Sequence, residues 1–481
     1  MRLPPARLIW PLLVAAGLGA AYATTLLPDV GYETDTAKFD YLGRVLGTGH
    51  PPGYPLYTLL NAVFVRVLPV GTLAFRANLL SAVLAVGAGL LLYGALVELH
   101  VRRPVAAVGA TVFGLTRSLW SQAIVAEVYA LHLVFVAAVL LLLLRWRRSR
   151  ADRDLLLAVG LYGLSFSHHL STALLAPGVA WFVLRTDPRV LTRWRLLVAA
   201  CAVAMAGLLP YLYLFWRSTD PGLAYAEVRV TDLPSFWAAF TGGGYRQHMF
   251  AFGPRAMLTE RLALFGGLLR QQPLLPALPF AAWGLLRLRG RPVAGLLLAW
   301  AVINTVWAMG YDVSDVHVFF VPTYLVVVAW ATVGADALVT AVPERLEVAA
   351  TALLLTAPLG LLWANHATVD LSDDPTAAGV RAALDHMAGG GVVFTYHFHH
   401  FNYFLTGLGL RADHAVYPLY PEPFQRIAMY CAGAVALDVP HVGVRAPPGL
   451  PVYAYGQGYV ERLRAAGLTV TPVLAELSAV H

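Results

Sequence analysis

The sequence is poor in charge. Asp, Glu, Lys and Arg make up 13% of its 481 residues, whereas 58% are hydrophobic. Water-soluble domains carry about 25% charged residues, so this composition excludes a single soluble core. It indicates an α-helical polytopic membrane protein.

Cysteine is nearly absent, and the usual nucleotide-binding motifs are missing. Cys201 and Cys431 lie far apart, which excludes a disulfide framework and a cysteine-based metal site. The chain has no G-x-G-x-x-G motif, no P-loop and no internal repeat. His397, His399 and His400 cluster, but no cysteine or suitably spaced carboxylate accompanies them. If this segment is a strand, the first two share a face and the third points away. We therefore expect neither a metal nor another cofactor.

Long apolar runs, in contrast, are frequent. A bilayer core about 30 Å thick requires about 20 helical residues. By this criterion the sequence predicts about eleven transmembrane helices, at 8–27, 77–98, 104–120, 125–145, 154–167, 170–185, 195–215, 268–286, 292–310, 318–341 and 347–365. The first run lacks a small-x-small cleavage site, so we expect a retained helix and not a removed signal peptide.

The basic residues predict the orientation of these helices. They cluster between the apolar runs, at 100–103, 145–153, 185–195, 287–291 and 345. The positive-inside rule places all five clusters in the cytoplasm, together with Arg2 and Arg7 at the N-terminus. This pattern explains the net charge of +7 without a nucleic-acid partner. The first outer loop 28–76, the long loop 216–267 and the tail then face the extracytoplasmic side.

Two segments outside the predicted spans have their own patterns. In 55–69, apolar residues recur at helical spacing, which predicts an amphipathic helix lying on the membrane surface. If it crossed the membrane, every later basic loop would change sides. From residue 366 onward, turn-rich polar sequence separates short apolar strands from helices. We therefore predict a transmembrane catalytic domain, 1–365, and a small extracytoplasmic α/β domain, 366–481.

The segment GYETDTAKFDYLGRVLGTGHPPGYPLY, residues 31–57, is the most informative in the chain. It follows directly on the first apolar run, so Glu33, Asp35 and Asp40 are crowded against a membrane face. Ionisable groups in such a place are costly to desolvate and indicate function.

Further ionisable groups recur at the other predicted outer helix ends. The candidate catalytic carboxylates are Asp35 and Glu127. The candidates for binding a donor phosphate or sugar are Arg217, Arg246, Tyr245, His50, Tyr54, His168, His169 and Asp315.

This combination suits glycosyl transfer from a lipid phosphate. Arginine supplies bidentate donors that keep their charge near lipid and hold a phosphate. A carboxylate can take the proton of an acceptor hydroxyl while the leaving phosphate is stabilised electrostatically. The prenyl chain of the donor would stay in the bilayer.

Several motifs together resemble a known family. These are GYETDTAKFDYLG followed by HPPGYPLY, then FRANLLSAV, AEVYALH, GLSFSHHLS, YLYLFWRS and DVHVFFVPTY, which occur in this order within residues 8–340. They are similar to GT-C membrane proteins related to the transmembrane protein O-mannosyltransferases. The resemblance implies a GT-C fold, an inverting mechanism and a polyprenyl-phosphate sugar donor such as polyprenyl-phosphate mannose.

The resemblance also implies residue roles. Asp35 matches the aspartate of the family's first-loop motif, its presumed catalytic base, and Glu127 matches a second acidic position. Family members often have a glutamate three residues after that aspartate. Here the position is Lys38, a departure that bears on the choice of acceptor.

Each candidate also has a structural interpretation. Asp35 is a suitable N-cap for a helix starting near Thr36, and Glu127 suits the first turn of its helix. The remaining alternatives are snorkelling for Arg217, a solvated loop for Arg246, packing of the turn for His50, an interfacial aromatic for Tyr54, helix-to-helix hydrogen bonding for His168 and His169, and loop capping for Asp312 and Asp315.

Other functions remain open at this stage. A transporter or flippase for a lipid-linked sugar would place its charges near the bilayer midplane, often within inverted repeats. A ligase that transfers a whole oligosaccharide, or a membrane scaffold with a partner-binding tail, is also compatible with the composition. The sequence names neither the sugar nor the acceptor, which is a protein hydroxyl, a glycan or a lipid.

Overall fold

The computed structural model describes residues 7–31, 34–387, 389–411, 413–418, 424–443, 445–465 and 467–481. Glu33 and Arg2, named above, lie outside the described residues. The chain divides into two compact units. The first unit consists of residues 1–26, 81–212 and 237–370, and the second of residues 27–80, 213–236 and 371–481. The second unit thus combines the tail with the first predicted outer loop and part of the long one.

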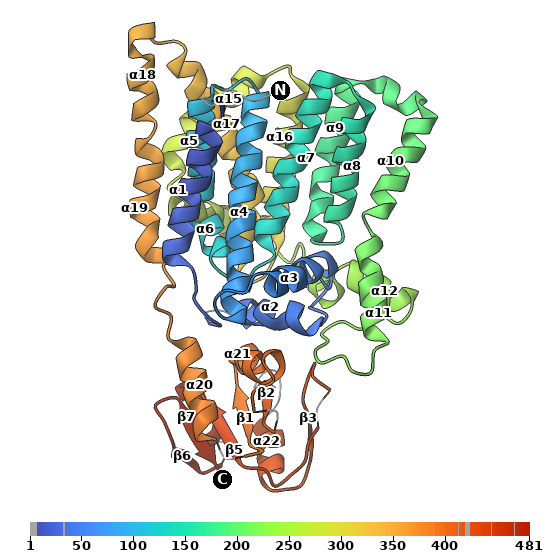
Figure 1. Ribbon diagram of the computed structural model, residues 1–481, viewed down its shortest axis with the longest axis vertical. Coiled ribbons are helices and arrows are strands. Elements are labelled where there is room, and N and C mark those ends of the chain that lie inside the picture. The colour runs from blue at the N-terminus through green and yellow to red at the C-terminus, as the bar shows by residue number, and fades with distance from the viewer. Residues whose placement is uncertain are drawn as a thin grey trace. The chain divides into compact units, whose positions relative to one another are not determined.

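The first unit is helical. Its elements are α1 (Ile9–Thr25), most of α4 (Leu73–Glu98), α5 (Arg103–Gly114), α6 (Arg117–Ala123), α7 (Tyr129–Ser149), α8 (Asp152–Ser165), η2 (Leu170–Leu175), α9 (Ala176–Thr186), η3 (Pro188–Thr192), α10 (Trp194–Ala206), η4 (Leu209–Tyr211), η5 (Gly243–His248), α13 (Pro254–Ala256), η6 (Met257–Arg261), α14 (Leu262–Gln271), η7 (Leu275–Ala277), α15 (Leu278–Leu288), α16 (Pro292–Gly310), η8 (Val316–Phe320), α17 (Val321–Val339), α18 (Glu344–Leu353) and α19 (Thr356–Val369). Figure 1 shows α7, α8, α9 and α16 running alongside one another.

Six helices of the described chain are long and apolar enough to cross a membrane: Leu73–Glu98, Tyr129–Ser149, Trp194–Ser218, Pro292–Gly310, Val316–Val339 and Glu344–Val369. The prediction of an integral membrane protein is confirmed. The other predicted spans are also helical but shorter than the expected 20 residues. For example, 104–120 is divided between α5 and α6, because the backbone leaves helical geometry at Thr116 (ψ 139°) before α6 begins at Arg117.

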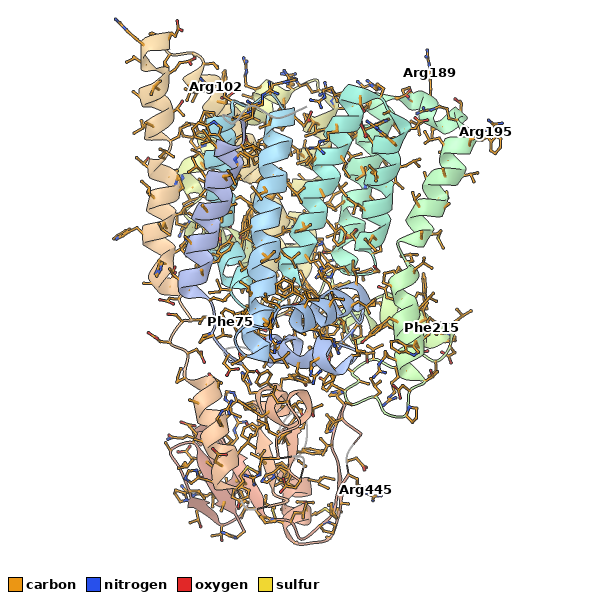
Figure 2. The ribbon with its side chains drawn as sticks, in the orientation of Figure 1. Phe75, Arg102, Arg189, Arg195, Phe215 and Arg445 are labelled. Carbon is orange, nitrogen blue, oxygen red and sulfur yellow. The ribbon has the colours of Figure 1, made fainter. Side chains whose placement is uncertain are left out.

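The predicted basic loops share one end of the first unit. Figure 2 shows Arg102, Arg189 and Arg195 at this end of its helices. Since α7 ends and α8 begins among these basic residues, the residues before α7 and after α8 lie at the opposite end. Glu127 and His168 occupy those two positions.

The second unit begins with α2 (Thr34–Val45) and α3 (Pro55–Val67). It also contains α11 (Leu212–Ser218), which starts at the end of the first unit, and the first half of α12 (Leu233–Phe240). The predicted helix at 55–69 is confirmed. Its buried face includes Tyr57, Asn61 and Val65. Val63 and Val67 of the predicted apolar stripe are 62% and 75% exposed, which suits contact with a membrane surface.

The tail forms the α/β structure predicted from its alternating pattern. Its elements are α20 (Thr376–His386), β1 (Val392–Thr395), α21 (Phe398–Asn402), η9 (Tyr403–Gly407), β2 (Ala415–Pro418), α22 (Phe424–Cys431), β3 (Leu437–Asp438), β4 (Arg445–Ala446), β5 (Val452–Tyr455), α23 (Gln457–Ala465), β6 (Val470–Pro472) and β7 (Leu477–Val480).

The main sheet of the tail has the strand order β2-β1-β5-β7-β6. β1 pairs in parallel with β2 and β5, whereas β7 pairs antiparallel with β5 and β6. The chain leaves the sheet at Thr395, so His399 and His400 lie on α21 and not on a strand. Helix α21 packs against α2 within the second unit, as Figure 1 shows.

Candidate active site

Asp35 and Lys38 form the start of the candidate site. Both lie at the beginning of α2, three residues apart, so their side chains project from the same face of the helix. Lys38 Nζ donates to Asp35 Oδ1 at 2.9 Å. The Lys38 side chain is only 1% exposed, whereas that of Asp35 is 55% exposed. The carboxylate is therefore accessible, and the ammonium group beneath it is buried.

Glu227 brings a second carboxylate to the same ammonium group. Its Oε1 and Oε2 lie 3.3 and 3.4 Å from Lys38 Nζ. A local strand pairing places it there, because Thr48 N donates to the Tyr225 carbonyl (3.1 Å) and Glu227 N donates to the Thr48 carbonyl (2.9 Å). A Cβ atom at Gly47 would lie 2.8 Å from the Tyr225 carbonyl, so the close approach of the two segments requires glycine at this position.

His50 and Tyr54 complete the contacts around Lys38. His50 Nδ1 lies 2.7 Å from Lys38 Nζ, and His50 Nε2 lies 3.1 Å from Tyr54 Oη. An ammonium group has no acceptor, so Nδ1 accepts and the proton of a neutral ring is on Nε2. The Phe39 ring packs edge-on against Tyr54, with ring centroids 5.7 Å apart.

The shared ammonium group controls the ionisation of both carboxyl groups. Burial acts to raise the pKa of Glu227, but Lys38, His50, His399 and the Tyr225 hydrogen bond together outweigh burial and lower the pKa to about 2. For Asp35, partial desolvation of the carboxyl group against the protein acts to raise the pKa, and Lys38, His50 and His399 together hold it well below its usual range. Both groups are thus ionised at neutral pH.

The tail contributes a histidine to this cluster. His399 Nε2 lies 3.9 Å from Glu227 Oε1, and His399 Nδ1 lies 3.4 Å from Tyr41 Oη. Burial and the nearby Lys38 charge lower the pKa of His399 to about 4, so its imidazole is neutral at pH 7. Tyr225 donates a short hydrogen bond to Glu227 Oε1.

Arg217 also lies in the second unit, and its guanidinium group is engaged within the protein. Arg217 Nε donates to the Leu46 carbonyl at 2.7 Å, and Nη1 pairs with Asp220. Only 9% of the side chain is exposed. These contacts brace the loop that leads from α2 to His50.

The first unit holds the remaining candidates. Glu127 is buried, and its Oε2 accepts from the Val128 amide at 3.2 Å. The Val128 carbonyl lies 2.8 Å from His168 Nε2. The sequence candidates Glu127 and His168 are therefore neighbours.

His169 and Asp315 are linked to this group through Tyr129. Tyr129 donates to Asp315 Oδ2 at 3.0 Å, and its ring lies 5.8 Å from that of His169. His169 Nδ1 and Ser171 Oγ are 2.7 Å apart. The predicted catalytic residue Glu127 and the predicted binding residues His168, His169 and Asp315 thus lie in one polar group, in which the His168 and His169 rings are 6.1 Å apart.

Tyr245 and Arg246 lie on η5. The chain just beyond them is tied to the Asp315 loop, because Asp312 N donates to the His248 carbonyl at 2.9 Å. Tyr245 and Arg246 are exposed, and Arg246 Nε makes a long contact with the Gly243 carbonyl, 3.4 Å.

Three members of the Asp35 cluster were not among the sequence candidates for the site: Lys38, Glu227 and His399. Lys38 was noted only as a departure from the family pattern. Glu227 lies in a long loop without periodicity, and no local signal marks it. The histidine-rich segment of the tail was conspicuous, but the sequence did not show what His399 contacts.

Comparison with known proteins agrees with this fold. Residues 35–192 match the family model described as the protein O-mannosyl-transferase TMEM260 N-terminal domain. The mouse protein O-mannosyl-transferase TMEM260 is 32% identical over 200 residues, which is 40% of this chain and 28% of the mouse protein. The resemblance predicted from the sequence motifs is confirmed.

Solved structures extend the comparison to the whole chain. ArnT from Cupriavidus metallidurans, in complex with undecaprenyl phosphate, has a TM-score of 0.63 at 14% identity, covering 98% of this chain and 97% of ArnT. An oligosaccharyltransferase from Archaeoglobus fulgidus has a TM-score of 0.56 at 11% identity, covering 98% of this chain and 72% of that protein. The chain has the GT-C fold.

The extent of the similarity differs between the two kinds of relative. The alignment with a second relative, the Dictyostelium discoideum protein O-mannosyl-transferase tmem260, covers 40% of this chain and 26% of that protein at 23% identity. The chain thus aligns with less than a third of the length of these curated relatives, although it matches ArnT almost end to end.

Proposed function

We propose that this protein is an integral membrane glycosyltransferase that transfers mannose from a polyprenyl-phosphate donor to an acceptor hydroxyl on the extracytoplasmic side. The observation that carries the proposal is the exposed Asp35 carboxylate held by the buried Lys38 ammonium group in the segment that matches the O-mannosyltransferase family model. The donor class is supported by the undecaprenyl phosphate bound to the structurally similar ArnT.

The proposed reaction is a single displacement. The acceptor oxygen attacks the anomeric carbon of the sugar as its proton passes to Asp35, and a new C–O bond forms. The bond between the anomeric carbon and the phosphate oxygen breaks, and its electron pair stays on the phosphate. Because one displacement occurs and no covalent intermediate forms, the anomeric configuration is inverted.

The other candidates have supporting roles in this proposal. Arg246, which is exposed, is suited to hold the donor phosphate, since a guanidinium group binds phosphate in a bidentate manner. Arg217 braces the loop that carries His50. Within the first unit, Glu127, His168, His169 and Asp315 form a polar group suited to bind a sugar or an acceptor hydroxyl, and no metal takes part.

The direct test uses purified protein in lipid nanodiscs with radiolabelled polyprenyl-phosphate mannose and a cell-envelope extract. We expect label to pass to a protein, glycan or lipid acceptor with inverted configuration. The site of the label identifies the acceptor class. Transfer only from a nucleotide sugar, or movement of intact donor across the bilayer without transfer, would contradict the proposal.

A further inference from the structure

Lys38 is the only lysine in the chain. The composition has 34 Lys and Arg residues, and every other one is arginine. Every other position of this kind, from the basic loops to buried helix ends, therefore carries arginine. A position that carries lysine against this background requires a property that arginine lacks.

The contacts of Lys38 show what that property is. An ammonium group is compact and has three N–H donors that point in different directions. Among the described residues, Lys38 Nζ lies near three side chains: Asp35 Oδ1 at 2.9 Å, His50 Nδ1 at 2.7 Å and the Glu227 carboxylate, whose oxygens are 3.3 and 3.4 Å away. A planar guanidinium fork suits bidentate pairing with one carboxylate and does not provide this geometry.

The charges around Lys38 are unequal. Two carboxylates share one ammonium group, and the His50 ring lies against the same group, with Nδ1 2.7 Å from Lys38 Nζ. If Lys38 faced Asp35 alone, the pair would be fully neutralised, and Asp35 would be a weaker base. Glu227 offsets part of the positive charge because a second carboxylate nearby disfavours ionisation of the first.

We propose that Lys38, Asp35 and Glu227 form one charge-sharing unit in which Lys38 is a positioning residue that orients Asp35. In this unit Glu227 is a second carboxylate on the same ammonium group, so the Lys38 charge is shared and does not fall on Asp35 alone. The proposal rests on the glycosyl transfer proposed above.

The unit can be tested without an activity assay, because selective 15N-lysine labelling gives a single side-chain signal. In the full-length protein in nanodiscs, we expect one slowly exchanging ammonium resonance from the buried Lys38. Asp35→Asn and Glu227→Gln should each shift this resonance and speed its hydrogen exchange. Glu461→Gln, at an exposed position of α23 in the same unit, is the matched control and should leave it unchanged. A rapidly exchanging signal that none of the variants moves would overturn the proposal.

A second measurement separates positioning from folding. Lys38→Met should lower kcat about 100-fold and bring an acid limb into the pH–rate profile near the ordinary carboxyl range, at about pH 4. Lys38→Arg should not restore the rate, and Glu227→Gln should lower kcat with little change in the donor KM. Wild-type rates and profiles in all three variants would refute the unit. If the wild-type protein transfers no sugar, the proposed function fails, while the resonance experiment still decides whether the unit exists.

Discussion

The polar group around Lys38 and the polar group around Tyr129 are built differently, although both come from segments predicted to face the outside. Around Lys38, ionised side chains meet, and one carboxylate is open to solvent. Around Tyr129, two imidazoles, hydroxyl groups and the carboxyl groups of Glu127 and Asp315 are held by hydrogen bonds to backbone and hydroxyl partners. An exposed carboxylate beside a shared ammonium group suits proton transfer, whereas a set of side chains held by fixed hydrogen bonds suits recognition of a polar ligand.

The largest effect is expected from removing the ionised side chains of the group around Lys38. The triple variant Asp35→Asn, Lys38→Met, Glu227→Gln removes the ionised groups together, and replacing buried ionic groups together is often tolerated by the fold. We expect the transfer rate to fall by about 10²- to 10⁴-fold, the usual contribution of a general base. Initial rates at saturating donor, with thermal unfolding as a check, measure this.

The matched control acts on the first unit. Replacing His168 and His169 by asparagine keeps these two side chains polar, and we expect a loss of less than about tenfold, mainly in KM. Equal losses in the two variants would remove the distinction between a reactive group and a binding group.

Lowering the pH should show how much the ionised Glu227 contributes to the stability of the protein. The folded pKa of Glu227 is lowered from 4.5 to about 2. Its contribution to the free energy of unfolding is therefore complete above about pH 4.5 and is lost as the pH falls through about 2. It amounts to at most about 3 kcal/mol. Thermal unfolding of the wild type and Glu227→Gln from pH 6 to pH 3 measures it. Over this pH range the wild type should lose more stability than Glu227→Gln does. Parallel curves for the two proteins would be the contrary result.

Smaller effects are expected for the two arginine candidates, one on stability and the other on donor binding. Arg217→Gln removes hydrogen bonds to Leu46 and Asp220, and we expect a loss of about 1–2 kcal/mol in the free energy of unfolding. Arg246→Gln, at an exposed position, should leave stability unchanged and raise the donor KM. Thermal unfolding and donor titrations distinguish them. A reversed pattern would make Arg217 the phosphate ligand.

Local patterns in the sequence predict much of this fold. The apolar run 292–310 coincides with α16, and the tail motifs give α20, β1, β5, α23 and β6. The spacing of Asp35, His50 and Tyr54 within one short segment also indicated part of the candidate site correctly as a set of neighbours, since His50 bonds to both Lys38 and Tyr54.

Contacts between distant segments could not be predicted in this way. Glu227 reaches Lys38 through a pairing of Thr48 with Ala226, and neither strand segment is long enough to show periodicity. The partners of Arg217 are the Leu46 carbonyl and Asp220, and a backbone acceptor leaves no trace in the sequence. Span lengths were overestimated where the backbone leaves helical geometry within an apolar run, as it does at Thr116.

The central claim is that the Asp35 carboxylate is the base for sugar transfer. The initial rate of mannose transfer from polyprenyl-phosphate mannose by purified Asp35→Asn tests it most directly, because asparagine keeps the size of the side chain and removes its basicity. We predict a rate at least about 100-fold below that of the wild type with unchanged donor binding. Transfer by Asp35→Asn at the wild-type rate would contradict the account.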